Sequence, residues 1–228
     1  MDTNGIILGL EGDVTCYSSG LDIGYARDFV TREESYLRTE SVDNAWLGLD
    51  FGNKFSVKPT HYTVRYANGS EFQTLPRNWL FQGANDVALL KTKAATEIDP
   101  KVDPNWVTLV SHDNDPSFGD DPAFMVRTFP VPKEKQKQAY RIFRLVSTGT
   151  CADGVSKNLC FTSFEIYGTR LERNVDEEIA QDADDDKFKQ KTDYPYPGTG
   201  TKYSFSKSNR YKRYYATSER VANGYLWT

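Results

Sequence analysis

Apolar and polar residues alternate along short stretches through the first 170 positions of the chain. In the segment WLGLDF and the residue before it, Ala45, Leu47, Leu49 and Phe51 occupy every second position, with polar or small residues between most of them. Successive side chains of a strand point to opposite faces, so this spacing predicts a strand with one apolar face.

The same pattern, or a short apolar run bounded by turn residues, predicts a series of further strands. These lie at 62–66, 79–81, 106–110, 124–131, 140–146 and 161–167. No helical periodicity of comparable strength occurs among them. Many short strands without helical crossovers are typical of an antiparallel sandwich, so we predict an all-β fold over residues 1–170.

Two interruptions stand out within this region. Asn68 and Gly69 tolerate the positive φ of a tight turn, and they predict that 58–86 forms a strand, a hairpin turn and a second strand. The stretch 87–104, VALLKTKAATEIDPKVDP, has turn-like ends and helix-forming residues in its middle. We interpret it as an insertion between two strands.

The character of the chain changes after Gly168. Residues 172–193 are acidic, and Asn174 followed by Glu177 is a plausible helix start. The last residues, from 202 onward, are basic and rich in tyrosine. We therefore predict a second unit over 171–228, an irregular or partly helical C-terminal extension.

Several of these stretches together resemble the discoidin, or coagulation factor 5/8 type C, superfamily. The similar segments are VKPTHYTVR at 57–65, NWLFQGAND at 78–86, WVTL at 106–109 with His112, YRIFRL at 140–145 and FEIYG at 164–168. The pattern is most similar to the intracellular subgroup found in HECT-type ubiquitin ligases and BTB-domain proteins. The resemblance extends over about 4–168.

This resemblance implies a galactose-binding-like β-sandwich of the jelly-roll type, which is not itself a catalyst. Members of the superfamily bind glycans, lipids, peptides or proteins through loops at one end. The chain departs from the pattern at Val87, where the family has glycine, and in the acidic and basic extension. It contains no BTB or HECT segment, so a ligase activity does not follow.

Composition limits the partners, the cell compartment and the cysteine redox state that we expect for the protein. The net charge of −4 provides no overall attraction for nucleic acid or a membrane surface. No long apolar run and no leader-like N-terminus are present, so we expect a cytoplasmic protein. A cytoskeletal, ciliary or ligase-like complex is an example of the assembly that it would join. Cys151 and Cys160 lie close enough in sequence to close a loop, but we expect them and Cys16 to be reduced thiols.

The sequence provides no recognisable catalytic site, so we expect no enzyme activity and no catalytic residues. His61 is a candidate general base, but a histidine within a strand pattern is better explained as one hydrogen-bonded to backbone inside a sheet. Trp46, Trp79 and Trp106 are more consistent with packing than with a ligand platform.

An oxygen-rich loop is the one candidate for a metal. Asp113, Asp115 and Asp120 provide carboxylates of the kind that Ca²⁺ prefers. The spacing is not that of an EF-hand, and nearby proline and glycine favour a solvated turn. We therefore expect no cofactor, with calcium as the minority interpretation.

The basic extension is the predicted partner-binding segment. Cations and aromatic rings suit an acidic protein surface through charge and cation–π contact. The candidate residues are Tyr203, Phe205, Arg210, Tyr211, Lys212, Arg213, Tyr214 and Tyr215. Two alternatives stay open, namely that the segment folds back over the sandwich or that it is disordered.

Two functions of different classes follow from these features. The first is a non-catalytic structural module, fastened to a protein partner in a larger intracellular assembly through the insertion and the extension. The second is a lectin-like module for carbohydrate or lipid, supported by Ca²⁺ in one version, with a ligand loop formed by Tyr17, Tyr25, Arg27 and Phe29. A nucleic-acid partner is not expected.

Overall fold

The computed structural model describes the part of the chain that carries the predicted sandwich. The described residues are 5–8, 14–33, 35–66, 74–92, 97–119 and 125–173. The whole predicted extension beyond Arg173 lies outside them. None of the helices in the described residues is long and apolar enough to cross a membrane.

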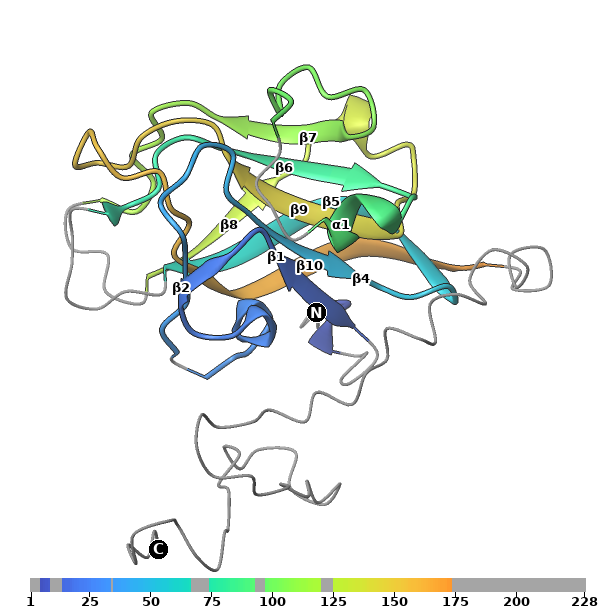
Figure 1. Ribbon diagram of the computed structural model, residues 1–228. Coiled ribbons are helices and arrows are strands. Elements are labelled where there is room, and N and C mark those ends of the chain that lie inside the picture. The colour runs from blue at the N-terminus through green and yellow to red at the C-terminus, as the bar shows by residue number, and fades with distance from the viewer. Residues whose placement is uncertain are drawn as a thin grey trace, which may run out of the picture. The chain divides into compact units, whose positions relative to one another are not determined.

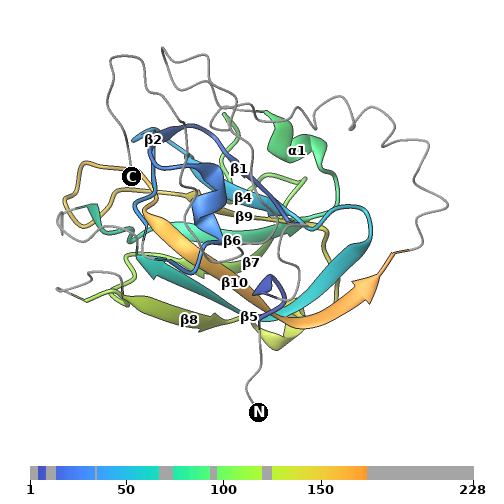
Figure 2. The same cartoon turned by 90° about the horizontal axis from the view of Figure 1, so that it is seen from below.

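The described residues form two main antiparallel sheets, which Figure 1 shows as stacked layers. The strands of the larger sheet, in spatial order, are β1 (Thr15–Ser18), β4 (Trp46–Asp50), β9 (Ile142–Ser147), β6 (Trp79–Ala84) and β7 (Val107–His112). The strands of the smaller sheet are β10 (Phe161–Glu172), β5 (Phe55–Tyr66) and β8 (Val126–Pro130), side by side in Figure 2. The predicted all-β antiparallel sandwich is confirmed.

Smaller elements complete the described part of the fold. β2 (Leu21–Ile23) and β3 (Arg38–Thr39) form a two-stranded sheet. Two short 3-10 helices, η2 (Ala26–Phe29) and η4 (Lys133–Lys135), lie in connections, and α1 (Ala88–Lys91) follows β6.

The main core lies between the two large sheets and follows the predicted alternation. On β4, Leu47 and Leu49 belong to this core, while Trp46 lies in a second apolar cluster on the outer face of the same sheet. Tyr62 and Val64 enter the core from β5 and are fully buried. Every residue of β4, β6 and β9 is buried, because both faces of the large sheet are covered.

The stretch 87–104 does connect β6 to β7, and it covers the outer face of the large sheet. Val87 and Leu90 join the outer cluster, together with Trp106 just beyond the stretch. Asn85 and Asp86 begin the excursion: Asn85 accepts the backbone N–H of Arg141 at 2.9 Å, and Asp86 accepts that of Ala88.

A cluster of buried polar side chains, which we call the Gln82–Arg144 cluster, holds the insertion against the large sheet. Gln82 donates to the backbone carbonyl of Pro100 at 2.7 Å and accepts from Arg144 at 2.8 Å. Arg144 also pairs with Asp103 at 3.4 Å and lies over the ring of Trp106. Burial lowers the pKa of Arg144 to about 10, although Asp103 favours the charged form.

The predicted hairpin over 58–86 is wrong in one respect. β5 belongs to the small sheet and β6 to the large sheet, so the two strands do not pair. The connection crosses from one layer to the other, which a local turn signal cannot reveal. Asn68 and Gly69 themselves lie outside the described residues.

A bulge in β5 explains how a proline fits into the central strand of the small sheet. His61 faces Tyr167 and Pro59 faces Gly168, which leaves Thr60 as an extra residue. A bulge interrupts the ladder where proline has no N–H to donate. The bulge also changes which residues face the core, so that Tyr62 points inward and His61 is exposed.

The three cysteines are free thiols, as expected. Burial raises the pKa of Cys16 to about 12, and it raises the pKa of Cys151 as well. These thiols are therefore protonated at neutral pH and are poor nucleophiles.

An N-terminal segment is held against β10 by a backbone hydrogen bond, from Ile6 N–H to the Ile166 carbonyl at 2.9 Å, and by one carboxylate. The side chain of Glu165 accepts the backbone N–H groups of Ile7 at 2.7 Å, Leu8 at 3.1 Å and Ile166 at 2.9 Å. Arg32 adds an ion pair at 3.4 Å. Gly5 lies so close that an added Cβ would collide with the Glu165 side chain.

We expect Glu165→Ala to lower the free energy of unfolding by about 3 kcal/mol, because three largely buried amide groups lose their acceptor. Urea unfolding measures the loss. The matched control is Glu172→Gln at the exposed end of the same strand, which should change stability by less than about 0.5 kcal/mol. Equal stability of the two variants would contradict the role assigned to Glu165.

Candidate functional site

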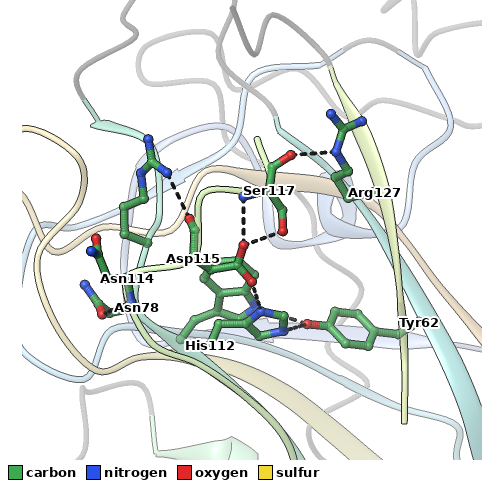
Figure 3. Close-up of polar contacts among 9 residues, drawn as sticks. Tyr62, Asn78, His112, Asn114, Asp115, Ser117 and Arg127 are labelled. Atoms are coloured by element: carbon green, nitrogen blue, oxygen red, sulfur yellow. Dashed lines mark hydrogen bonds and ion pairs between the residues drawn. The ribbon is translucent and has the colours of Figure 1, made fainter. Parts of the chain in front are cut away.

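Four connections meet at one end of the sandwich, which we call the loop end. It is the end where β1, β7 and β9 finish at Ser18, His112 and Ser147, and where β4 and β6 begin at Trp46 and Trp79. Because the resemblance places ligands at loops of one end, this is the candidate site. Figure 3 shows the polar contacts at its base.

A chain of hydrogen bonds runs through the core beneath these loops. The indole N–H of Trp79 donates to the hydroxyl oxygen of Tyr62 at 3.1 Å. That hydroxyl lies 2.6 Å from Nε2 of His112, and Nδ1 of His112 lies 2.5 Å from Asp115 Oδ2 (Figure 3). The rings of His112 and Trp79 stack with centroids 3.9 Å apart.

The surroundings decide where the protons of this chain reside. Burial lowers the pKa of His112, and the carboxylate of Asp115 offsets only part of that effect. Burial alone would raise the pKa of Asp115, but hydrogen bonds from Ser117 and His112 bring it below its usual value. A neutral His112 therefore donates its Nδ1–H to Asp115 and accepts a hydrogen bond from the Tyr62 O–H at Nε2.

Neighbouring polar groups join three of the loops. Asn78 accepts the backbone N–H of Asn114 at 2.8 Å and donates to the carbonyl of Thr150 at 2.7 Å. Arg77 and Asp115 exchange two further bonds, from the Asp115 N–H to the Arg77 carbonyl and from the Arg77 guanidinium to the Asp115 carbonyl. The base of the loop end is therefore rigid.

This arrangement resembles an acid–base relay, but the histidine that would act as the base is buried and out of reach of a substrate. The side chains of Tyr62 and Trp79 are fully buried, and His112 is 6% exposed. A general base must come within hydrogen-bond reach of the substrate proton. The chain of hydrogen bonds is therefore structural, and its effect is to satisfy buried polar groups.

His61, the predicted sheet histidine, lies apart from this network. Its ring is exposed on β5, and Nδ1 lies 3.2 Å from the hydroxyl of Thr60, a side chain rather than the expected backbone group. The two histidines therefore lie on opposite sides of the small sheet. His112 bonds Tyr62 on the core side, and His61 is on the solvent side.

The three carboxylates considered for calcium do not form a site in the described residues. Asp113 is exposed, and both oxygens of Asp115 already accept hydrogen bonds, from His112 and from Ser117. Asp120 lies outside the described residues. Within those residues no group of three or more acidic, histidine or cysteine side chains could hold a metal ion.

The predicted ligand loop is only partly assembled. Arg27 lies over the ring of Tyr25, with 5.3 Å between the guanidinium carbon and the ring centroid. Phe29, in contrast, is fully buried and stacks on Phe164 at 4.6 Å, so it belongs to the core. Tyr17 packs against the outer apolar cluster.

The predicted partner-binding residues of the extension cannot be placed. Tyr203, Phe205, Arg210, Tyr211, Lys212, Arg213, Tyr214 and Tyr215 lie outside the described residues. The three tryptophans considered as a platform are buried, with Trp79 in the main core and Trp46 and Trp106 in the outer cluster.

Sequence reasoning missed the network around His112. Tyr62 and His112 are 50 positions apart, and only the fold brings them together. The three-residue spacing of His112 and Asp115 was a local signal, because it fits an imidazole–carboxylate contact in a turn.

No family model matches the chain. It is 30% identical over 151 residues, or 65% of its length, to the E3 ubiquitin-protein ligase Ufd4 of Drosophila melanogaster. It is 28% identical over 171 residues, or 74% of its length, to the E3 ubiquitin-protein ligase hecd-1 of Caenorhabditis elegans. The chain spans only 5% and 6% of these two relatives.

Among solved structures, a carbohydrate-binding module from Clostridium thermocellum Xyl5A superposes with a TM-score of 0.44 at 18% identity. The match covers 70% of this chain and 95% of that module. The resemblance to a module of ubiquitin ligases, drawn from the sequence motifs, is confirmed by the two sequence relatives.

We expect the free energy of unfolding to fall as pH drops below about 6.5, the usual imidazole pKa. The pKa of His112 is lowered in the folded protein, so the unfolded chain binds the proton first and acid favours unfolding. Urea unfolding between pH 7 and pH 5 measures the slope. His112→Gln should flatten it.

The chain provides a matched control, because it has two histidines. His61→Gln should keep the wild-type slope, since that ring is exposed to solvent. The histidine NMR signals of the unmutated protein give a second measurement that does not depend on how well the variant folds. Titration of His112 at or above the usual imidazole pKa would overturn the prediction.

Proposed function

We propose that this chain, a discoidin-like β-sandwich similar to a segment of ubiquitin ligases, is a non-catalytic interaction module of a larger intracellular assembly. The insertion and the C-terminal extension fasten it to a protein partner. The relatives' names describe proteins about twenty times longer than the matched segment, so the ligase activity is not transferred to this chain.

The observation that carries the proposal is the contrast between buried and exposed groups. Tyr62, Trp79 and His112 of the hydrogen-bonded chain are buried in the core. The insertion, in contrast, displays Ile98 at 49% exposure and Val102 at 71%. Large apolar side chains on a surface favour contact with another protein when their backbone is held in place.

The buried Gln82–Arg144 cluster holds the backbone of the insertion in place. Pro100, between the two exposed side chains, accepts the hydrogen bond from Gln82, and Asp103 pairs with Arg144. A partner that covers Ile98 and Val102 therefore binds a segment that has little conformational freedom left to lose.

We expect Ile98→Asp with Val102→Asp to reduce partner recovery by about tenfold or more, because two apolar contacts would be replaced by charges that must be desolvated. Deleting Tyr194–Thr228 should also abolish assembly while the sandwich stays folded. The measurement is recovery of the partner and the mass of the native complex from the protein's own cells.

Val155→Asp is the control for the insertion, because Val155 is 77% exposed at the loop end. It should leave recovery unchanged. Unaltered recovery in both the insertion variant and the deletion variant would refute the proposed function.

A lectin-like function is the second candidate, and one feature of the loop end favours it. Tyr25 is 47% exposed and Tyr36 is 54% exposed, and Arg27 lies over the ring of Tyr25. Flat aromatic rings beside a guanidinium suit the apolar face and the hydroxyl groups of a sugar.

If the loop end binds carbohydrate, a glycan array should give a signal that Tyr25→Ala and Tyr36→Ala reduce by about tenfold, the effect of losing about 1.4 kcal/mol of contact. Val102→Asp, on the insertion, serves as the control and should leave that signal intact. An array with no signal above background would remove this candidate.

A further inference from the structure

We propose that the end of the sandwich opposite the loop end carries a docking surface for an acidic polypeptide segment. This inference rests on the proposed interaction function and names the chemistry of one partner. The surface, which we call the basic strip, consists of Lys54, Lys58, Lys133, Lys135 and Lys137.

The topology brings these residues together from two separate segments, the first part of β5 with the residue before it and the connection between β8 and β9. The first part of β5 is flanked on one side by the end of β10, where Thr169 faces Lys58 and Arg170 faces Val57. On its other side lies the connection between β8 and β9, where Val131 donates to the carbonyl of Thr60 at 2.8 Å. Lys58 and Thr169 share the outer face of the small sheet, whereas Arg170 lies on the other face with Val57 and Phe55. The strip is therefore formed by the lysines of β5 and of the connection.

The connection that carries three of the lysines has a fixed backbone. Tyr140 and Val57 exchange two hydrogen bonds of 2.9 Å, which tie its far end to β5. The side chain of Gln136 donates to the carbonyl of Val131 at 2.7 Å, and η4 shapes the residues between. The lysines thus extend from a scaffold that is already ordered before a partner binds.

The charge of the two segments that form the strip is opposite to that of the whole chain. Residues 54–58 and 132–139 contain five lysines and one glutamate, Glu134. The full chain has a net charge of −4. Within the part of the chain that the structure describes, no carboxylate forms an ion pair with the five lysines of the strip.

The exposure of the cations fits a partner that approaches from solvent. Lys54 and the three lysines of the connection are exposed, and Lys58 is half-buried. Several like charges on one surface raise the local concentration of an oppositely charged segment and speed its encounter.

Two features favour a polypeptide over other polyanions. Binding of single-stranded nucleic acid uses free aromatic faces for base stacking, whereas Phe55, the ring next to Lys54 in the chain, packs against the core and is covered by Arg170 at 4.6 Å. Membrane surfaces are held by apolar side chains as well as cations, and the exposed large hydrophobic residues of the described part all lie outside the strip.

The test uses the full chain and a short fluorescent peptide rich in glutamate, with a glutamine-for-glutamate peptide as the matched ligand. Fluorescence anisotropy at low and at near-physiological salt measures binding. We expect the glutamate peptide to bind, the glutamine peptide not to bind, and the affinity to fall as salt screens the charges.

The variant Lys133→Gln with Lys135→Gln should weaken binding of the glutamate peptide by about fivefold, since each exposed charge contributes modestly. The control, Val42→Glu with Val155→Glu, makes the same change in net charge at the loop end and should bind as the unmutated chain does. Both control positions are exposed, so folding should tolerate them.

Equal weakening in the two variants would show that net charge alone matters and would overturn the inference. So would tighter binding of duplex DNA, or of phosphatidylserine vesicles, than of the glutamate peptide. The proposed function is judged separately, by partner recovery with the insertion and extension variants, so either can fail while the other stands.

Discussion

The pairing of polar groups inside an aromatic core is the constraint on which the loop end depends. Trp79 and Tyr62 are large, fully buried residues, and each brings one polar group into the interior. An unpaired buried N–H or O–H costs about 1–3 kcal/mol, so both must find partners. The Tyr62 hydroxyl satisfies Trp79, and His112 satisfies Tyr62.

The need to pair buried polar groups also determines the structure of a loop at the surface. His112 can accept from Tyr62 only if its other nitrogen carries the proton, and Asp115 provides the acceptor for that proton. Asp115 lies in the loop after β7, where Ser117 also donates to it. The shape of the loop end is therefore a consequence of the core, because moving the loop would leave the imidazole without its partner.

The sequence predicts the layers of the sandwich well because strand faces are a local property. Alternation at Leu47, Leu49 and Phe51 identifies the inner face of β4 without any knowledge of its neighbours. Hydrogen bonds between residues far apart in the sequence leave no periodic pattern. The His112 network and the bonds from Glu165 to the N-terminal segment were therefore not predicted. The hairpin prediction was wrong for the same reason: turn residues determine a local bend, but not which sheet receives the next strand.

The two ends of the sandwich differ in what they can offer a partner. The loop end is rigid and carries exposed aromatic residues, such as Tyr25 and Tyr36. The opposite end carries the basic strip, and the insertion also starts there, since β6 ends and β7 begins at that side (Figure 1). A protein partner held by the insertion and the basic strip would leave the loop end accessible. Because the described sheets form one packed core between these ends, the two surfaces can be occupied at once without competing for the same side chains.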